Sequence, residues 1–254
     1  MTLHVYQCPI QQCVWDVTAL NGEIFILYGP SGQDAVIHVH DRNNIAEIKD
    51  VISLPGRCLG AIAACNVSNC VYAYLGAVPS VVRITKDEEH QFNISPFIND
   101  SRIMQHCPTM SVSANGSLLF FSEEEREAPP TVAIYNANGF LQHEIMFPQY
   151  AGEMIRLAHL GDTILKSNGN IVLVTSGYNK RKLLEMDMSG NVVREYQSSL
   201  DLYDCVTFED RHGRILITDV HMGMELIDAE YNLLDFSFPQ LDKNRVFHFM
   251  HSIQ

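Results

Sequence analysis

The sequence predicts an all-β protein of the β-propeller class, and two observations support this prediction. Short blocks rich in Val, Ile, Phe and Tyr alternate with turn residues along the chain, and long stretches with a helical period are absent. The same order of four short strands then recurs every 41 to 51 residues. This spacing matches the ~40 to 50 residues of one propeller blade, which is a four-stranded antiparallel sheet.

The first unit shows the pattern most clearly. Its four strands are predicted over 14–20, 23–29, 35–41 and 45–52. The first turn is the Asn-Gly pair at 21–22, and both residue types tolerate the positive φ that a tight hairpin requires. The second strand contains the run Ile-Phe-Ile-Leu at 24–27, which is apolar on both faces. Such a sheet has to pack against a neighbour on each side, as the blades of a propeller do.

Four further units repeat this order of strands. The first residue of the third turn marks each unit, at Asp41, Lys86, Asn136, Asp187 and Asp228. The five units span about 13–56, 57–101, 107–148, 153–200 and 203–241. We therefore predict a single domain over 1–254, a six-bladed propeller with five full units and a closing blade. Strands from 244–254 and 1–12 would form the closing blade and hide the edges of the ring. A β-sandwich with irregular hairpins is the alternative topology.

The segments 16–29, 189–194 and 204–219 resemble NHL repeats, the units of one type of six-bladed propeller. Each shows part of the repeat pattern, a hydrophobic first strand, a Gly turn and a strand that ends in Asp. After Asp219 the sequence continues Val-His-Met-Gly, where the family usually has Asn-X-Arg. The resemblance extends loosely over most of the chain. The resemblance implies six blades. Propellers of this type include enzymes as well as binding domains, so the resemblance alone does not decide between these functions.

Charge and composition exclude several classes of function. A formal net charge of −13 opposes binding to nucleic acid, because phosphate contacts depend on Lys and Arg. The sequence contains no run of 18 consecutive apolar residues, so it predicts no membrane-spanning segment. The sequence contains no Gly-X-Ser-X-Gly motif, no phosphate-binding loop and no dinucleotide fingerprint. Seven cysteines without paired short spacings, and a start without a secretory leader, predict reduced thiols and a cytoplasmic location.

The strongest candidate site is the mouth of the central channel, where the loops that enter the first strands converge. Candidates at these positions are Trp15, Asp16, His106, Glu153, Tyr203, Asp204 and His248. Because no catalytic set stands out among them, we expect a binding or scaffold module without a cofactor. Its partner would be a protein or a small-molecule ligand. The expected contacts are Trp15, Asp16, Tyr203 and Asp204.

The alternative is a metal-dependent hydrolase or lyase, since propellers of the lactonase, strictosidine-synthase and amidating-lyase types are related to this class. Asp16, Glu153 and Asp204 come from three units and could bind Ca²⁺ through carboxylate oxygens. His106 or His248 would then transfer a proton. A zinc site like that of the amidating lyase would instead use three histidines, His106, His159 and His248.

Overall fold

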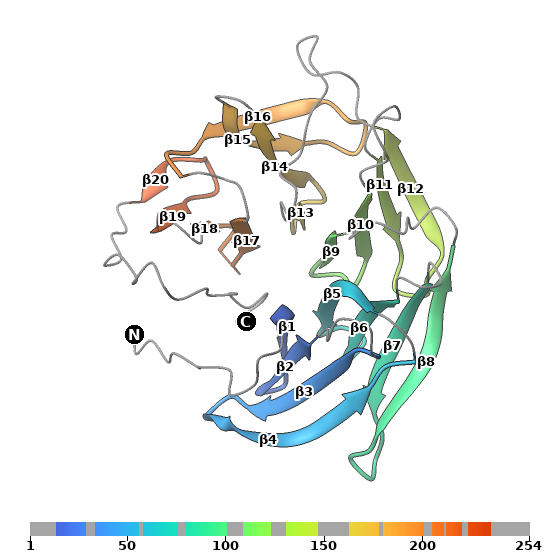
Figure 1. Cartoon of the computed structure of the whole chain (residues 1–254). Helices are drawn as coiled ribbons and strands as arrows, with labels where there is room; N and C mark the ends of the chain where they lie inside the picture. The colour runs from blue at the N-terminus through green and yellow to red at the C-terminus, as the bar shows by residue number, and fades with distance from the viewer. Residues whose placement is uncertain are drawn as a thin grey trace.

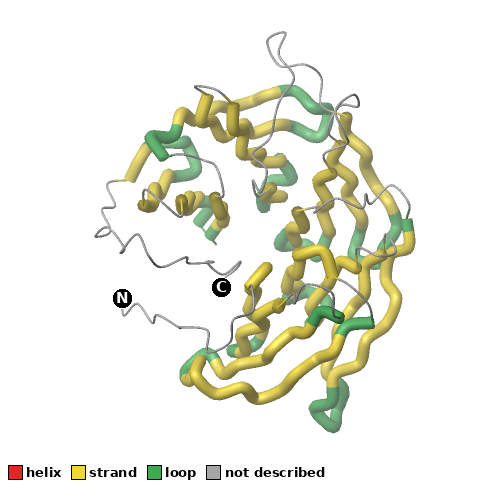
Figure 2. Tube along the Cα trace, in the orientation of Figure 1, coloured by secondary structure: helices red, strands yellow, loops and turns green. Residues whose placement is uncertain are grey.

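The computed structural model contains five four-stranded antiparallel sheets arranged around a common axis (Figure 1). The residues that it describes are 14–28, 34–55, 58–75, 80–100, 109–122, 131–146, 163–177, 180–200, 205–210, 212–219 and 223–234. Strands and turns account for all the regular structure of this part of the chain (Figure 2). No helix long and apolar enough to cross a membrane occurs in it.

Each sheet is one blade, and its strands follow each other in chain order from the axis outward (Figure 1). Blade 1 contains β1 (Val14–Leu20), β2 (Glu23–Tyr28), β3 (Val36–Asp41) and β4 (Asn44–Ser53), and blade 2 contains β5 (Cys58–Cys65), β6 (Cys70–Leu75), β7 (Ser80–Lys86) and β8 (Phe92–Asn99). Blade 3 contains β9 (Thr109–Val112), β10 (Leu118–Ser122), β11 (Thr131–Tyr135) and β12 (Leu141–Met146), and blade 4 contains β13 (Thr163–Leu165), β14 (Ile171–Gly177), β15 (Lys180–Met186) and β16 (Val192–Gln197). Blade 5 contains β17 (Cys205–Glu209), β18 (Ile215–Asp219), β19 (Gly223–Ile227) and β20 (Leu233–Leu234).

Seven of the described hairpins share one five-residue turn. Its first residue bonds through its N–H to the carbonyl of the fifth, and its carbonyl accepts the N–H of the fourth. The turns begin at Asp87, Ser113, Asn136, Lys166, Asp187, Asp210 and Asp228. The fourth residue has a φ between 63° and 89°, and it is Gly in five of the seven. Where the first residue is Asp or Asn, its side chain also accepts N–H groups of the turn, which fixes the loop locally.

The blades pack through both faces of their sheets, as the apolar second strands predict. Phe25 and Leu27 of β2 face blade 2, where they join a cluster that includes Ile62 and Ala73. The inner strands then contact one another in the order β1, β5, β9, β13 and β17. Because the sheets are buried on both faces, we expect a single sheet of this sequence to be unstable on its own.

The prediction of an all-β propeller is confirmed. The described residues form five blades, whereas the sequence predicts six. Both segments of the predicted closing blade, 1–12 and 244–254, lie outside the described residues. The sixth, closing blade therefore stays a prediction from the sequence.

Candidate functional site

The two faces of the ring differ in the connections that they carry. We call one the short-turn face, because it carries the hairpin turns between the first and second and between the third and fourth strands of each blade. All seven copies of the five-residue turn lie on it. The opposite face, the connection face, carries the links from second to third strands and from blade to blade. The 16 residues between β12 and β13 are the longest of these links between described strands.

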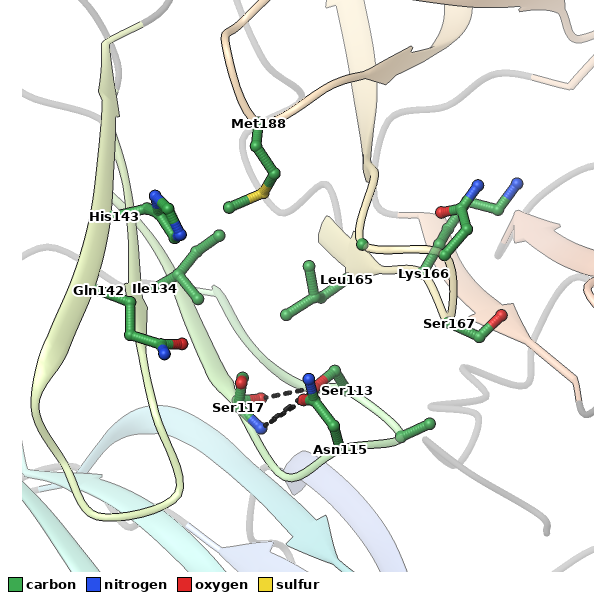
Figure 3. A pocket seen from close by; sticks show the side chains of 13 residues that line it. Ser113, Asn115, Ser117, Ile134, Gln142, His143, Leu165, Lys166, Ser167 and Met188 are labelled. Atoms are coloured by element: carbon green, nitrogen blue, oxygen red, sulfur yellow. Dashed lines mark hydrogen bonds between the residues drawn. The ribbon is translucent and has the colours of Figure 1, made fainter.

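A groove of about 490 Å³ lies between blades 3 and 4 on the short-turn face (Figure 3). Ligand pockets commonly occupy ~300 to 1,000 Å³, so this groove is large enough to bind a ligand. Residues from both blades line it: Ser113, Ala114, Asn115, Ser117, Ile134, Gln142, His143, Leu165, Lys166, Ser167, Asn168, Gly169 and Met188. The two turns that open β10 and β14 thus form its opposing walls.

The wall from blade 3 is a turn with a fixed side-chain arrangement. The Ser117 N–H donates to Ser113 Oγ and to Asn115 Oδ1, each at 3.1 Å. The Ser113 hydroxyl also donates to Asn115 Oδ1, so this oxygen accepts two bonds (Figure 3). Because these bonds hold the Asn115 carboxamide, its orientation is set before any ligand arrives.

Behind the wall from blade 4, on the side that faces blade 5, lies a buried ion pair. Lys166 Nζ lies 3.1 Å from Glu185 Oε2, and the two side chains are 6% and 5% exposed. Glu185 Oε1 also accepts hydrogen bonds from Asn170 Nδ2 at 2.6 Å and from Asn168 Nδ2 at 3.4 Å. Burial raises the pKa of Glu185, but the bonds from Asn170 and Lys166 outweigh burial and hold the pKa below its ordinary value. The carboxylate is therefore charged and balances the ammonium group.

Between the two walls, Ile134, Leu165 and Met188 form an apolar floor (Figure 3). Gln142 and His143 of β12 border the groove on the side of blade 3, and both are exposed. None of the described lining residues is Asp or Glu. The groove therefore offers amide, hydroxyl and imidazole groups above an apolar surface, which suits a polar ligand without net charge.

Of the residues that the sequence predicts as contacts, Trp15 and Asp16 are described. Asp16 Oδ2 accepts the N–H of Ile62 in β5 at 2.8 Å, and Oδ1 accepts the N–H of Val17 at the same distance. The carboxylate thus joins blade 1 to blade 2. Trp15 is partly buried and packs against the apolar cluster between these blades. Neither residue lines the groove.

The remaining predicted site residues lie outside the described residues: His106, Glu153, His159, Tyr203, Asp204 and His248. Their roles as ligand contacts, metal ligands or proton carriers stay predictions. Within the described ranges, no group of three or more His, Cys, Asp or Glu side chains is arranged to hold a metal ion.

Sequence reasoning did not identify the groove. Its walls come from two turns that carry Asn-Gly pairs, at 115–116 and 168–169, which the sequence predicts only as hairpin turns. The available signal is that both pairs occupy the same position in neighbouring units. Because each blade packs against the next, turns at equivalent positions of adjacent blades lie on the same face of the ring, on either side of the boundary between the blades.

Comparisons with known proteins extend to the fold alone. No family model matches this sequence, and no curated protein matches it. A protein of unknown function from Bacteroides caccae superposes with a TM-score of 0.57 and 12% identity, over 90% of this chain and 82% of that one. The solved structure of YCF48 bound to D1 peptide superposes with a TM-score of 0.52 and 14% identity, over 92% of this chain and 69% of that one. The Pan2 WD40 domain of Neurospora crassa superposes with a TM-score of 0.54 and 11% identity, over 88% of this chain and 65% of that one.

Proposed function

We propose that this propeller is a binding module that holds an uncharged, extended peptide segment of a protein partner in the groove between blades 3 and 4. The observation that carries the proposal is the pairing of an apolar floor with polar side chains held in place by hydrogen bonds on the wall from blade 3. A peptide backbone carries one donor and one acceptor per residue. The exposed Gln142 carboxamide can pair with both, whereas Asn115, whose Oδ1 already accepts two bonds, can offer only its amide N–H groups. The apolar floor would take alternate side chains of the segment.

The charge of the groove favours a neutral ligand over an acidic one. Lys166 is the one cationic side chain among the described lining residues, and Glu185 already balances it. An acidic ligand would have to compete with this buried partner, and separating the pair would leave one charge buried without compensation. A neutral segment avoids this cost.

A structural neighbour is consistent with peptide binding. YCF48, whose solved structure is described as bound to D1 peptide, has the same fold at 14% identity. Fold alone does not establish function, so this likeness shows only that a similar ring can hold a peptide. Two finer proposals from the sequence do not involve the groove. The first is a sixth, NHL-like closing blade formed by 1–12 and 244–254. The second is a set of ligand contacts at the mouth of the central channel, made by Trp15, Asp16, Tyr203 and Asp204.

A displayed library of random peptides, panned against the folded protein, tests the proposal. We expect the selected peptides to be poor in charged residues. The double variant Gln142→Ala/Met188→Ala should weaken the binding of a selected peptide at least tenfold, about 1.4 kcal/mol, as measured by titration calorimetry. Val193→Ala is the matched control, since Val193 occupies in β16 the position that Gln142 has in β12, and it is exposed.

Two results would contradict the proposal. The first is that no peptide is enriched on the folded protein. The second is that the selected peptides bind the groove variant and the wild type equally well. Thermal unfolding of each variant shows whether the ring is intact, so a loss of binding can be separated from a loss of fold.

A further inference from the structure

Two cysteines face each other across the first hairpin of blade 2. Cys65 is the last residue of β5, Cys70 is the first residue of β6, and the two are direct partners in the strand register. Both side chains are fully buried, and both thiols are free. They lie directly beneath the four-residue tip 66–69, which is largely exposed.

The backbone already has the spacing that a disulfide needs. Directly opposed residues of an antiparallel pair have Cα atoms ~4.5 to 5.5 Å apart, and disulfides span Cα separations of ~4.4 to 6.8 Å. A bond between Cys65 and Cys70 therefore requires little or no movement of the strands. Cys58 pairs with Leu75 at the far end of this hairpin, roughly 20 Å away along the strand, so it cannot substitute for either partner.

The surroundings of the two thiols make them chemically unequal. The hydrogen bond from Cys70 lowers the pKa of Cys65 to about 5, and the Ser68 N–H, 3.4 Å from Cys65 Sγ, acts in the same direction against burial. The hydrogen bond to Cys65 and burial both raise the pKa of Cys70. Cys65 is thus the more acidic of the two thiols, and the thiolate is the form that reacts with disulfides.

We propose that Cys65 and Cys70 form a cross-strand dithiol that small disulfide oxidants, such as glutathione disulfide, convert to an internal disulfide. The Cys65 thiolate attacks one sulfur of the oxidant, which forms a mixed disulfide and expels one glutathione thiolate. Cys70 then loses its proton, and its sulfur attacks Cys65 Sγ and expels the second glutathione thiolate. The protons from the two cysteines end on two molecules of glutathione, so one oxidant is reduced for each protein disulfide.

The neighbours of the hairpin limit how the reaction can proceed. A side-chain carbon placed on Gly116 of blade 3 would lie 3.4 Å from Cys65 Sγ, so the turn of blade 3 covers this sulfur. On the other side, Asn21 Nδ2 of blade 1 donates to Asn69 Oδ1 at the tip. The oxidant has to reach Cys65 through a local opening of the tip, and we expect oxidation to be slower than for an exposed thiol.

Incubation of the folded full-length protein with defined ratios of glutathione disulfide to glutathione tests the proposal. After an acid quench, alkylation before and after reduction, followed by mass spectrometry, gives the oxidation state of each cysteine. The wild type should form the 65–70 disulfide without accumulating a glutathione adduct. Cys70→Ser should instead accumulate one adduct at Cys65, because no second thiol resolves it. Cys58→Ser is the matched control and should behave like the wild type.

Three results would overturn the proposal. In the first, Cys65 and Cys70 stay reduced under conditions that oxidise the urea-unfolded chain. In the second, Cys65 of the wild type remains a glutathione adduct. In the third, it pairs with a cysteine other than Cys70. If serine destabilises the buried hairpin, Cys70→Ala preserves an apolar side chain there and has to give the same adduct at Cys65.

Discussion

The boundary between blades 1 and 2 and the boundary between blades 4 and 5 are held together by different interactions. The first is a large apolar cluster, and the polar links between its two inner strands, β1 and β5, run from side chains to backbone. Asp16 accepts the N–H of Ile62, and Thr18 Oγ1 accepts the N–H of Ala64 at 3.1 Å. These two links follow the alternation of β1, so they join the inner strands of both blades at every second residue.

The boundary between blades 4 and 5 adds buried ionisable groups to its apolar cluster. Lys166 Nζ of the Lys166–Glu185 pair lies 5.3 Å from the ring centre of Tyr231, which belongs to blade 5. Glu225 of blade 5 is buried as well and accepts bonds from the Tyr196 hydroxyl at 3.1 Å and the Ser198 hydroxyl at 2.7 Å. Both of these donors come from the end of blade 4.

This difference indicates which boundary mainly stabilises the ring and which one makes the arrangement of the blades specific. Apolar packing is non-directional, and many pairs of sheet faces of similar shape could satisfy it. A buried ion pair contributes little net stability, but it is costly to leave incomplete, so it excludes wrong arrangements of the blades. We infer that, of these two boundaries, the one between blades 4 and 5 loses more stability when a single buried polar residue is replaced.

The largest effect is expected when the buried ion pair is broken from one side. Lys166→Met keeps the length of the side chain but leaves the Glu185 carboxylate buried without its cation. The free energy of unfolding, measured by urea denaturation, should fall by about 3 to 5 kcal/mol. Lys182→Met is the matched control. Lys182 pairs with Glu195 at 2.6 Å, but this pair is partly exposed and should contribute less than about 1 kcal/mol.

A double variant sharpens this prediction. Lys166→Met/Glu185→Leu removes both charges and should recover most of the lost stability, since an apolar pair avoids the desolvation cost. If Lys166→Met and Lys182→Met lower the stability equally, or if the double variant is less stable than Lys166→Met, the ion pair is not what distinguishes this boundary.

A smaller effect is expected at the boundary between blades 1 and 2. Asp16→Ala leaves the buried N–H of Ile62 without its acceptor and should lower the free energy of unfolding by about 1.5 to 3 kcal/mol. Asp50→Ala is a close control. Asp50 Oδ1 accepts the N–H of the following residue at 2.8 Å, as Asp16 Oδ1 does, but it is exposed and joins no other blade. Equal effects at the two positions would show that the link to blade 2 contributes nothing.

Asp16 also shows how far the sequence could predict the site. The order and spacing of the strands were predictable because they depend on local patterns, such as the turns at Asp187 and Asp228. An acidic residue near the start of an inner strand has the same local pattern whether it binds a ligand or the backbone of the next blade. The alignment of neighbouring blades decides between these roles, and it depends on packing between residues far apart in the sequence. The groove between blades 3 and 4 and the position of Lys166 beside Tyr231 were not predictable for the same reason.

The smallest effect concerns pH, and it separates two carboxylates at the boundary between blades 4 and 5. The folded-state pKa of Glu185 is lowered, so the unfolded chain binds this proton more readily. Glu185 therefore stabilises the fold above the ordinary carboxyl range and stops doing so as pH falls through its folded pKa. Glu209 accepts the N–H of Ser167 at 3.0 Å, yet burial raises its pKa, so the folded protein binds its proton more readily. Glu209 therefore contributes to stability at low pH, and this contribution is lost as pH rises from the ordinary carboxyl range through its raised folded pKa.

Two conservative variants make this contrast measurable. Urea unfolding of Glu185→Gln and Glu209→Gln, compared with the wild type between about pH 3 and pH 7, covers the ordinary carboxyl range. The stability deficit of Glu185→Gln should shrink as pH falls, because the wild type loses its charged carboxylate there. Glu209→Gln should gain stability relative to the wild type as pH rises, because it lacks the desolvated charge. Curves that run parallel to the wild type for both variants would mean that neither carboxylate senses its burial, and the polar character of this boundary would then have no electrostatic consequence.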